Sequence, residues 1–170
     1  MLDVEHRYVP KIDYLCDFQE DIKPFMRNVV TIWMLEVCED QQCEGQVYPM
    51  AINLLDRFLC VCVISRTQLQ LAATACLLIA SKTRQTRAFS TSLLSLYTNH
   101  SVSPEDIRDW ELLIVSKLKW DLIGINGHDF ASHIIARSPW TADHALLKNH
   151  AFTLIALGCT GGIKFLVIRY

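Results

Sequence analysis

Apolar residues recur at helical spacing along most of the chain, and one segment is apolar on nearly every side. In the stretch 69–84, the positions of one helical face are apolar, and so are most of the positions between them. A helix without a polar face must be surrounded by others, and its alanines allow close approach. We therefore predict a central buried helix, which ends at Ser81-Lys82-Thr83-Arg84 with cations suited to the helix dipole.

Further segments show the same periodicity between polar or helix-starting residues. Around the central helix we predict helices at 26–38, 46–60, 90–97 and 103–120. Ser103-Pro104-Glu105-Asp106 supplies an N-cap, a proline at the first helical position and two acids in the first turn. Ser65 is the expected N-cap of the central helix. Because no segment alternates like a half-buried strand over a useful length, the predicted fold class is all-α.

The pattern resumes after a linker at 121–127, with two more helices predicted at 128–137 and 142–159. The last segment, 161–170, is apolar but contains Gly161-Gly162 and Lys164. A membrane span needs about 20 predominantly apolar residues. We therefore favour an apolar tail that lacks its packing partners over a membrane span.

Composition and charge narrow the class of partner. The chain has 170 residues, 51% of them hydrophobic and 20% charged, which is ordinary for a globular domain. A net charge of -2 argues against dedicated binding of nucleic acid or of an anionic membrane, so we expect a protein partner. The seven cysteines form no CxxC pair, and without a signal peptide they indicate reduced thiols that act as small buried hydrophobes.

Enzyme signatures are absent from the sequence. No phosphate-binding loop, dinucleotide fingerprint, nucleophile elbow or zinc-protease pair is present. The six histidines fall in different segments, so neither a metal nor a cofactor is expected. A Cys/His nucleophile pair fits the spacing, but a chain this rich in both residues contains such pairs by chance. Asp56-Arg57, a charged pair in an apolar helix, is interpreted as structural.

Several segments, in order along the chain, resemble the signature of a cyclin box. They are Met26 to Cys38, Leu54-Leu55-Asp56-Arg57-Phe58-Leu59, Leu69-Gln70-Leu71, Ala80-Ser81-Lys82 and Lys117-Leu118-Lys119-Trp120-Asp121-Leu122. Segments similar to the D-type cyclins are Trp33 to Cys38, Leu96-Tyr97-Thr98, Ser103 to Glu111 and His128-Asp129-Phe130. Arg7-Tyr8-Val9-Pro10 and Ile22-Lys23-Pro24 resemble the third vertebrate member of that subfamily.

The resemblance implies a five-helix cyclin box followed by an incomplete second cyclin box. The implied domains are an N-terminal arm at 1–23, the first box at 24–122, and a linker with the truncated start of the second box at 123–170. Apolar helices of a partial second box would expose surface, which favours aggregation or a new partner. We expect a truncated variant such as an alternative transcript, and a longer protein represented here in part would look the same.

The resemblance also implies a regulatory subunit, not an enzyme, in the nucleus and cytoplasm. Such a subunit binds and activates a cyclin-dependent serine/threonine kinase and promotes the G1/S transition. In the family, a mobile kinase helix rests on the central and fifth helices, with Lys82 and Glu111 at the positions of the polar anchors. The other interpretation of these two residues is a simple surface ion pair within the chain. No cofactor, nucleic acid or membrane is expected.

A second site implied by the resemblance is a hydrophobic groove for Arg-x-Leu peptides of kinase inhibitors or substrates. Its residues are Met26, Val29, Val30, Trp33, Glu36, Arg66, Leu69 and Gln70. The apolar side chains would receive the peptide's leucine, Glu36 its basic residue, and Gln70 its extended backbone. Without the resemblance, this stripe is more typical of a helical core than of a groove.

Two local departures from the D-type pattern bear on function. These cyclins typically carry a Glu in the segment after the anchoring lysine, whereas here neutral Gln85 replaces the negative charge and Arg87 adds a positive one, which would weaken or redirect kinase choice. Tyr14-Leu15-Cys16-Asp17-Phe18 lacks the Glu of the Leu-x-Cys-x-Glu motif that engages retinoblastoma-type proteins. Together with the partial second box, these departures leave an alternative function, a non-activating decoy that sequesters the kinase, its inhibitors or its substrates.

Overall fold

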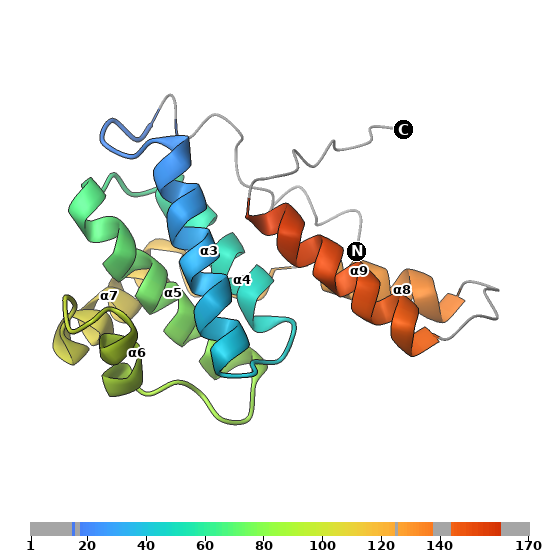
Figure 1. Ribbon diagram of the computed structural model, residues 1–170. Helices are drawn as coiled ribbons and strands as arrows, with labels where there is room; N and C mark the ends of the chain where they lie inside the picture. Colours follow the sequence, from blue (N-terminus) through green and yellow to red (C-terminus); the bar gives the residue numbers. More distant parts are fainter. Residues whose placement is uncertain (1–14, 16–17, 125, 138–143, 161–170) are drawn as a thin grey trace.

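The helices form where the periodicity predicts them. The computed structural model describes residues 15, 18–124, 126–137 and 144–160, and these contain helices and no strand (Figure 1). In chain order the elements are α3 (Pro24–Asp40), α4 (Val47–Leu59), the 3₁₀ turn η1 (Arg66–Gln68), α5 (Leu69–Arg84), α6 (Thr91–Tyr97), α7 (Pro104–Lys117), α8 (Gly127–Arg137) and α9 (His144–Cys159).

Helix α5 is the centre of the five-helix unit, as predicted. Eleven of its 16 residues are buried, and α3, α4, α6 and α7 pack around it (Figure 1). The buried hydroxyls on this helix are satisfied within it: Thr74 donates to the Gln70 carbonyl at 2.7 Å, and Ser81 to the Leu78 carbonyl at 2.8 Å. Ser81 Oγ also accepts the Phe89 amide at 3.1 Å, which ties the chain leading into α6 to the core.

Within the described residues, three helices end in Schellman motifs that contain no glycine. In each motif the last residues close with two backbone hydrogen bonds around a residue with positive φ. The residues with positive φ at this position are Gln42 after α3 (49°), Asn99 after α6 (52°) and Lys119 after α7 (55°). The residue after each of these closes the motif with its backbone amide. The amides of Cys43, His100 and Trp120 donate to the carbonyls of Cys38, Ser95 and Val115 at 2.9–3.0 Å.

One of these motifs explains why the predicted end of α7 was wrong. The helix predicted at 103–120 ends at Lys117, because Lys119 and Trp120 take left-handed backbone angles of 55° and 61°. Helix α3 is two residues longer at each end than predicted. The expected cap at Ser65 instead starts η1, where Ser65 and Gln68 form a capping box ahead of α5.

Helices α8 and α9 pack side by side and lie at one side of the five-helix unit (Figure 1). Helix α9 contacts α4, and Arg27 Nη1 donates to the carbonyl of Cys159 at 3.4 Å. Three predicted parts lie outside the described residues: residues 1–14 and 16–17 of the N-terminal arm, residues 142–143 of the last helix, and the apolar segment 161–170. The domain boundaries stay a prediction.

Among the described residues, no helix is both long enough and apolar enough to cross a membrane.

Candidate functional site

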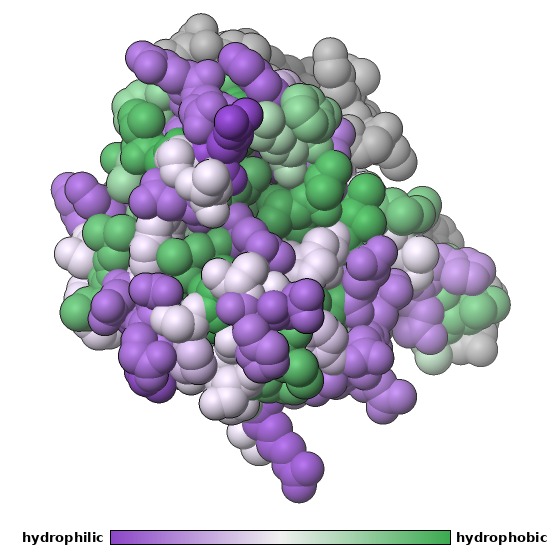
Figure 2. Space-filling model, turned by 60° about the vertical axis from the view of Figure 1, so that its left-hand side comes forward, coloured by the Kyte–Doolittle hydropathy of each residue, from purple (hydrophilic) through white to green (hydrophobic). Residues whose placement is uncertain are grey.

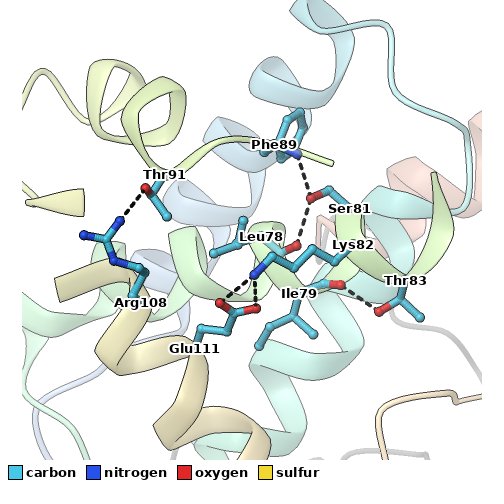
Figure 3. A network of polar contacts seen from close by, with 9 residues as sticks. All are labelled: Leu78, Ile79, Ser81, Lys82, Thr83, Phe89, Thr91, Arg108 and Glu111. Atoms are coloured by element: carbon cyan, nitrogen blue, oxygen red, sulfur yellow. Dashed lines mark hydrogen bonds and ion pairs between the residues drawn. The ribbon is translucent and has the colours of Figure 1, made fainter. Parts of the chain in front are cut away.

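The two predicted anchors lie side by side on neighbouring helices. Lys82 extends from the last turn of α5, and Glu111 from the middle of α7, toward one another (Figure 3). Lys82 Nζ donates to both carboxylate oxygens of Glu111, at 2.7 and 2.8 Å. The lysine side chain is 49% exposed and the glutamate 22%. The two residues thus form the surface ion pair of the other interpretation, and because the pair is open to solvent, a docking partner can also reach both charges.

A shallow groove of about 270 Å³ opens beside this ion pair. Its lining is mostly apolar and comes from α5, α7 and the chain that follows α7; it consists of Ile79, Lys82, Thr83, Arg108, Glu111, Leu112, Val115, Trp120 and Leu122. Two of the lining side chains are unusually open to solvent for their size, Trp120 at 74% and Leu112 at 66%. An exposed tryptophan and leucine next to a paired charge are typical of a protein-docking surface.

The position of Trp120 follows from the end of α7. As the last residue of a Schellman motif, Trp120 has its amide bonded to the Val115 carbonyl at 3.0 Å, and both side chains line the groove. Apolar periodicity predicted that Trp120 belongs to the helix, and no site was predicted for it. The sequence offered little indication of its position, because apolar periodicity does not show that Lys119 and Trp120 will both take left-handed backbone angles.

Charged neighbours frame the groove without entering its ion pair. Arg108 donates to the Thr91 hydroxyl at 3.3 Å (Figure 3). It also donates to the Glu105 carboxylate at 2.7 Å. Gln85, one of the departures from the D-type pattern, donates to the carbonyl of Arg87 at 2.7 Å. The side-chain amide of Gln85 therefore fixes the backbone of the segment 85–87, and the Arg87 side chain in this segment is exposed.

Figure 2, which brings the side of α6 and α7 forward, shows apolar side chains exposed in patches between hydrophilic ones.

The structure divides the residues predicted for the Arg-x-Leu groove. On α3, Val29 and Glu36 are exposed and Met26 and Trp33 are half-buried, whereas Val30 belongs to the core. The residues from η1 and α5 divide in the same way: Arg66 is exposed, Gln70 half-buried and Leu69 buried. The two helices pack against one another, so their exposed residues can border one surface.

Two hydrogen bonds hold the η1 and α5 part of this region. The Arg66 amide donates to the Asp21 carboxylate at 2.8 Å, and Gln70 Oε1 accepts from the Ser101 hydroxyl at 3.3 Å. Gln70 still has its amide nitrogen to offer to a peptide backbone. These eight residues line neither the groove beside Lys82 nor the second cavity described next.

A second cavity, of about 290 Å³, lies between the five-helix unit and the α8–α9 pair. Residues from α3, the α3–α4 turn, α4, α8 and α9 line it, among them Cys38, Cys43, Tyr48, His128 and Phe152. His128 is buried and packs on the Phe152 ring at 4.0 Å between centroids. Burial lowers the pKa of His128, and Lys148 lowers it further while Asp129 opposes the shift. The histidine is therefore neutral at neutral pH.

No group of three or more His, Cys, Asp or Glu among the described residues is arranged to hold a metal ion.

The described helices pack around a central buried helix and carry a groove of exposed apolar side chains beside an ion pair. These features are typical of a helical protein that docks to another protein. Residues 1–123 match the family described as cyclin, N-terminal domain, and the chain belongs to the cyclin family. Members of this family are regulatory subunits of kinases and not enzymes themselves.

Individual relatives agree with the predicted subfamily. The chain is 47% identical over 161 residues to G1/S-specific cyclin-D3 of Homo sapiens and 45% identical over 161 residues to G1/S-specific cyclin-D2 of Xenopus laevis. Each match covers 94% of this chain and 55% of the relative, so the chain spans about half the length of these relatives. The resemblance to D-type cyclins is confirmed.

The fold agrees with a solved structure as well. A viral cyclin from herpesvirus saimiri superposes with a TM-score of 0.81 at 25% sequence identity, covering 94% of this chain and 70% of the viral chain. The predicted all-α cyclin-box fold is confirmed.

Proposed function

We propose that this chain is a regulatory subunit that binds and activates a cyclin-dependent serine/threonine kinase and promotes the G1/S transition. The Lys82–Glu111 ion pair at the edge of the apolar groove is the observation that carries the proposal. The names of the relatives, G1/S-specific cyclins, support the direction of the regulation. The same proposal puts its action in the nucleus and the cytoplasm, as the resemblance implies.

The chemistry of the pair fits docking to a kinase helix. Lys82 has a third N–H to donate, and the Glu111 carboxylate has lone pairs beyond the two contacts that it makes with the ammonium. When a partner covers Leu112 and Trp120 and excludes water, hydrogen bonds to these charges become stronger. Breaking one member of such a covered pair typically costs about 2–5 kcal/mol of binding free energy.

The peptide surface on α3 and the start of α5 is proposed as a second contact, for inhibitors or substrates with Arg-x-Leu motifs. Exposed Val29 with half-buried Met26 and Trp33 offers apolar area, and exposed Glu36 offers a charge for the basic residue. The net charge of -2 favours such basic peptides over nucleic acid or an anionic membrane.

Binding to a kinase of the class that D-type cyclins bind is the test, with the purified full chain and with Lys82→Glu. We expect Lys82→Glu to weaken binding by about 30-fold or more, since two carboxylates would then face one another at the groove. Lys148→Glu, which reverses the charge of a lysine on α9 away from the groove, is the matched control and should bind like the parent chain.

An Arg-x-Leu peptide, titrated in parallel, tests the surface on α3. It should lose affinity for Val29→Glu and keep it for Ile32→Glu.

Phosphorylation of a retinoblastoma-type substrate by the same mixtures separates the two functions. Activity that appears with the parent chain and disappears with Lys82→Glu supports an activating subunit. Binding without activity would make the chain a decoy, the function that the Gln85 and Arg87 edge favours. Equal binding by the parent chain and Lys82→Glu would contradict the assignment of this groove.

A further inference from the structure

The end of α3 brings two cysteines together. Cys38 and Cys43 are the two residues that a Schellman motif joins: the Cys43 amide donates to the Cys38 carbonyl at 2.9 Å, and the Gln42 amide to the Glu39 carbonyl at 3.0 Å. Gln42 between them has a φ of 49°. In this motif the side chains at the two joined positions frequently contact one another. Here those side chains are thiols, and they are hydrogen-bonded to each other.

The two thiols differ in access. Cys38 is buried in the core cluster, whereas Cys43 is half-buried in the α3–α4 turn and only packs against that core. Both line the cavity between the five-helix unit and the α8–α9 pair. A small oxidant can therefore reach the sulfur of Cys43 more easily than that of Cys38. Both cysteines are free thiols and not in a disulfide.

The hydrogen bond between the two thiols shifts their pKa values in opposite directions. It lowers the pKa of Cys43 and raises that of Cys38, and burial raises the pKa of Cys38 further. Of the two thiols, Cys43 therefore loses its proton more readily. Because the thiolate is the nucleophile in oxidation, the accessible sulfur is also the more reactive one.

We propose that Cys43 and Cys38 form a reversible oxidation site, in which Cys43 reacts with a hydroperoxide and Cys38 resolves the product as an intramolecular disulfide. In the first step the Cys43 thiolate attacks one oxygen of hydrogen peroxide, the O–O bond breaks, and hydroxide leaves as the sulfenic acid forms. In the second step Cys38 sulfur attacks the Cys43 sulfur, the S–O bond breaks, and water leaves with the thiol proton. A cellular dithiol reverses the reaction by thiol–disulfide exchange.

Other described cysteines lack this combination. Cys76 is fully buried in α5, and burial raises its pKa. Cys60 and Cys62 are half-buried like Cys43 and lie two positions apart, but the Cys62 thiol contacts the neighbouring Val63 carbonyl at 3.9 Å. They provide a matched comparison within the same protein.

The sequence makes the test simple. Trypsin releases residues 28–57, with Cys38 and Cys43, as one peptide, and residues 58–66, with Cys60 and Cys62, as another. The purified full chain is treated with hydrogen peroxide, alkylated and digested. We expect the 28–57 peptide to lose two hydrogen atoms and to escape alkylation at least about fivefold more than the 58–66 peptide. Dithiothreitol should restore its alkylation.

Two variants assign the roles, after circular dichroism has shown that each folds. Cys38→Ser should stop at the sulfenic acid, which dimedone traps on Cys43. Cys43→Ser should leave Cys38 neither trapped nor oxidised. Equal oxidation of the two tryptic peptides, or unchanged oxidation of Cys38 in Cys43→Ser, would overturn the proposal.

Discussion

Arg27 and Asp56 form an ion pair that lies mostly out of the solvent. Arg27 Nε and Nη2 donate to the two oxygens of Asp56 at 2.7 and 2.6 Å, with the side chains only 13% and 10% exposed. Next along α4, Arg57 donates to the Asp121 carbonyl at 2.7 Å. The interpretation of Asp56-Arg57 as structural is confirmed, because both residues bind other parts of the fold.

Removing one charge of this pair should be costly. We expect Asp56→Ala to lower the free energy of unfolding by about 3–5 kcal/mol, since it leaves a buried guanidinium without its counter-charge. Glu105→Ala removes a mostly exposed ion pair to Arg108 and should cost at most about 1 kcal/mol. Urea unfolding followed by circular dichroism measures both, and similar losses for the two variants would contradict the argument. Arg27→Met/Asp56→Leu, which removes both charges, should recover most of the loss.

At the scale of the helix, the non-glycine residues with positive φ in the described part of the chain all lie just after helix C-termini. Three Schellman motifs use Gln42, Asn99 and Lys119 at the left-handed position, where glycine has no steric penalty. For a residue with a Cβ, this conformation costs about 1–2 kcal/mol of free energy. The motifs form because the backbone hydrogen bonds and the packing of the following residue offset that cost.

Lys119→Gly should therefore stabilise the protein. We expect the free energy of unfolding to rise by about 0.5–1 kcal/mol, because glycine relieves the left-handed strain at 55° but has more unfolded-state entropy to lose. Lys117→Gly, two positions earlier and still within α7, is the control and should lower it by up to about 1 kcal/mol. Thermal unfolding of the three proteins under one buffer condition tests the difference in sign. A loss of stability in Lys119→Gly would show that the lysine side chain outweighs its backbone strain.

The positions of the helices were predictable from the sequence, and the end of α7 was not. Apolar periodicity located each helix, because burial demands one apolar face per helix whatever the details of packing. The end of α7 escaped prediction, because no glycine marks the left-handed turn at Lys119 and Trp120. The same turn carries Trp120 into the groove, so the wrong boundary and the missed site residue have one cause.

At the scale of the whole molecule, the α8–α9 pair joins the five-helix unit through a partly polar contact. His128 lies buried on Phe152 at the wall of the second cavity, and Arg27 reaches the Cys159 carbonyl. Burial lowers the pKa of His128 below its ordinary value of 6.5. The folded protein thus holds this histidine neutral at pH values where the unfolded chain protonates it.

This contact should make stability depend on pH. Below pH 6.5 the unfolded chain binds a proton that folded His128 does not, so the free energy of unfolding should fall as the pH drops toward the lowered pKa. His128→Gln should flatten this fall between pH 7.5 and 5, and His150→Gln, on the exposed side of α9, should not. Denaturant unfolding at a series of pH values gives the slopes. Parallel curves for the parent chain and His128→Gln would contradict the assignment.

The sequence by itself determined the helical class, the order of the helices, the buried centre at α5 and the cyclin resemblance that pointed to Lys82 and Glu111. These follow from apolar periodicity, caps and short motifs, which depend on neighbours within a few turns of chain. Only the tertiary structure decided that Val30 and Leu69 enter the core while Val29 stays exposed. It also decided that Trp120 and Leu112 flank the ion pair, and that Cys38 meets Cys43. Such contacts depend on how helix ends turn and on which faces meet, and one local pattern is compatible with several arrangements.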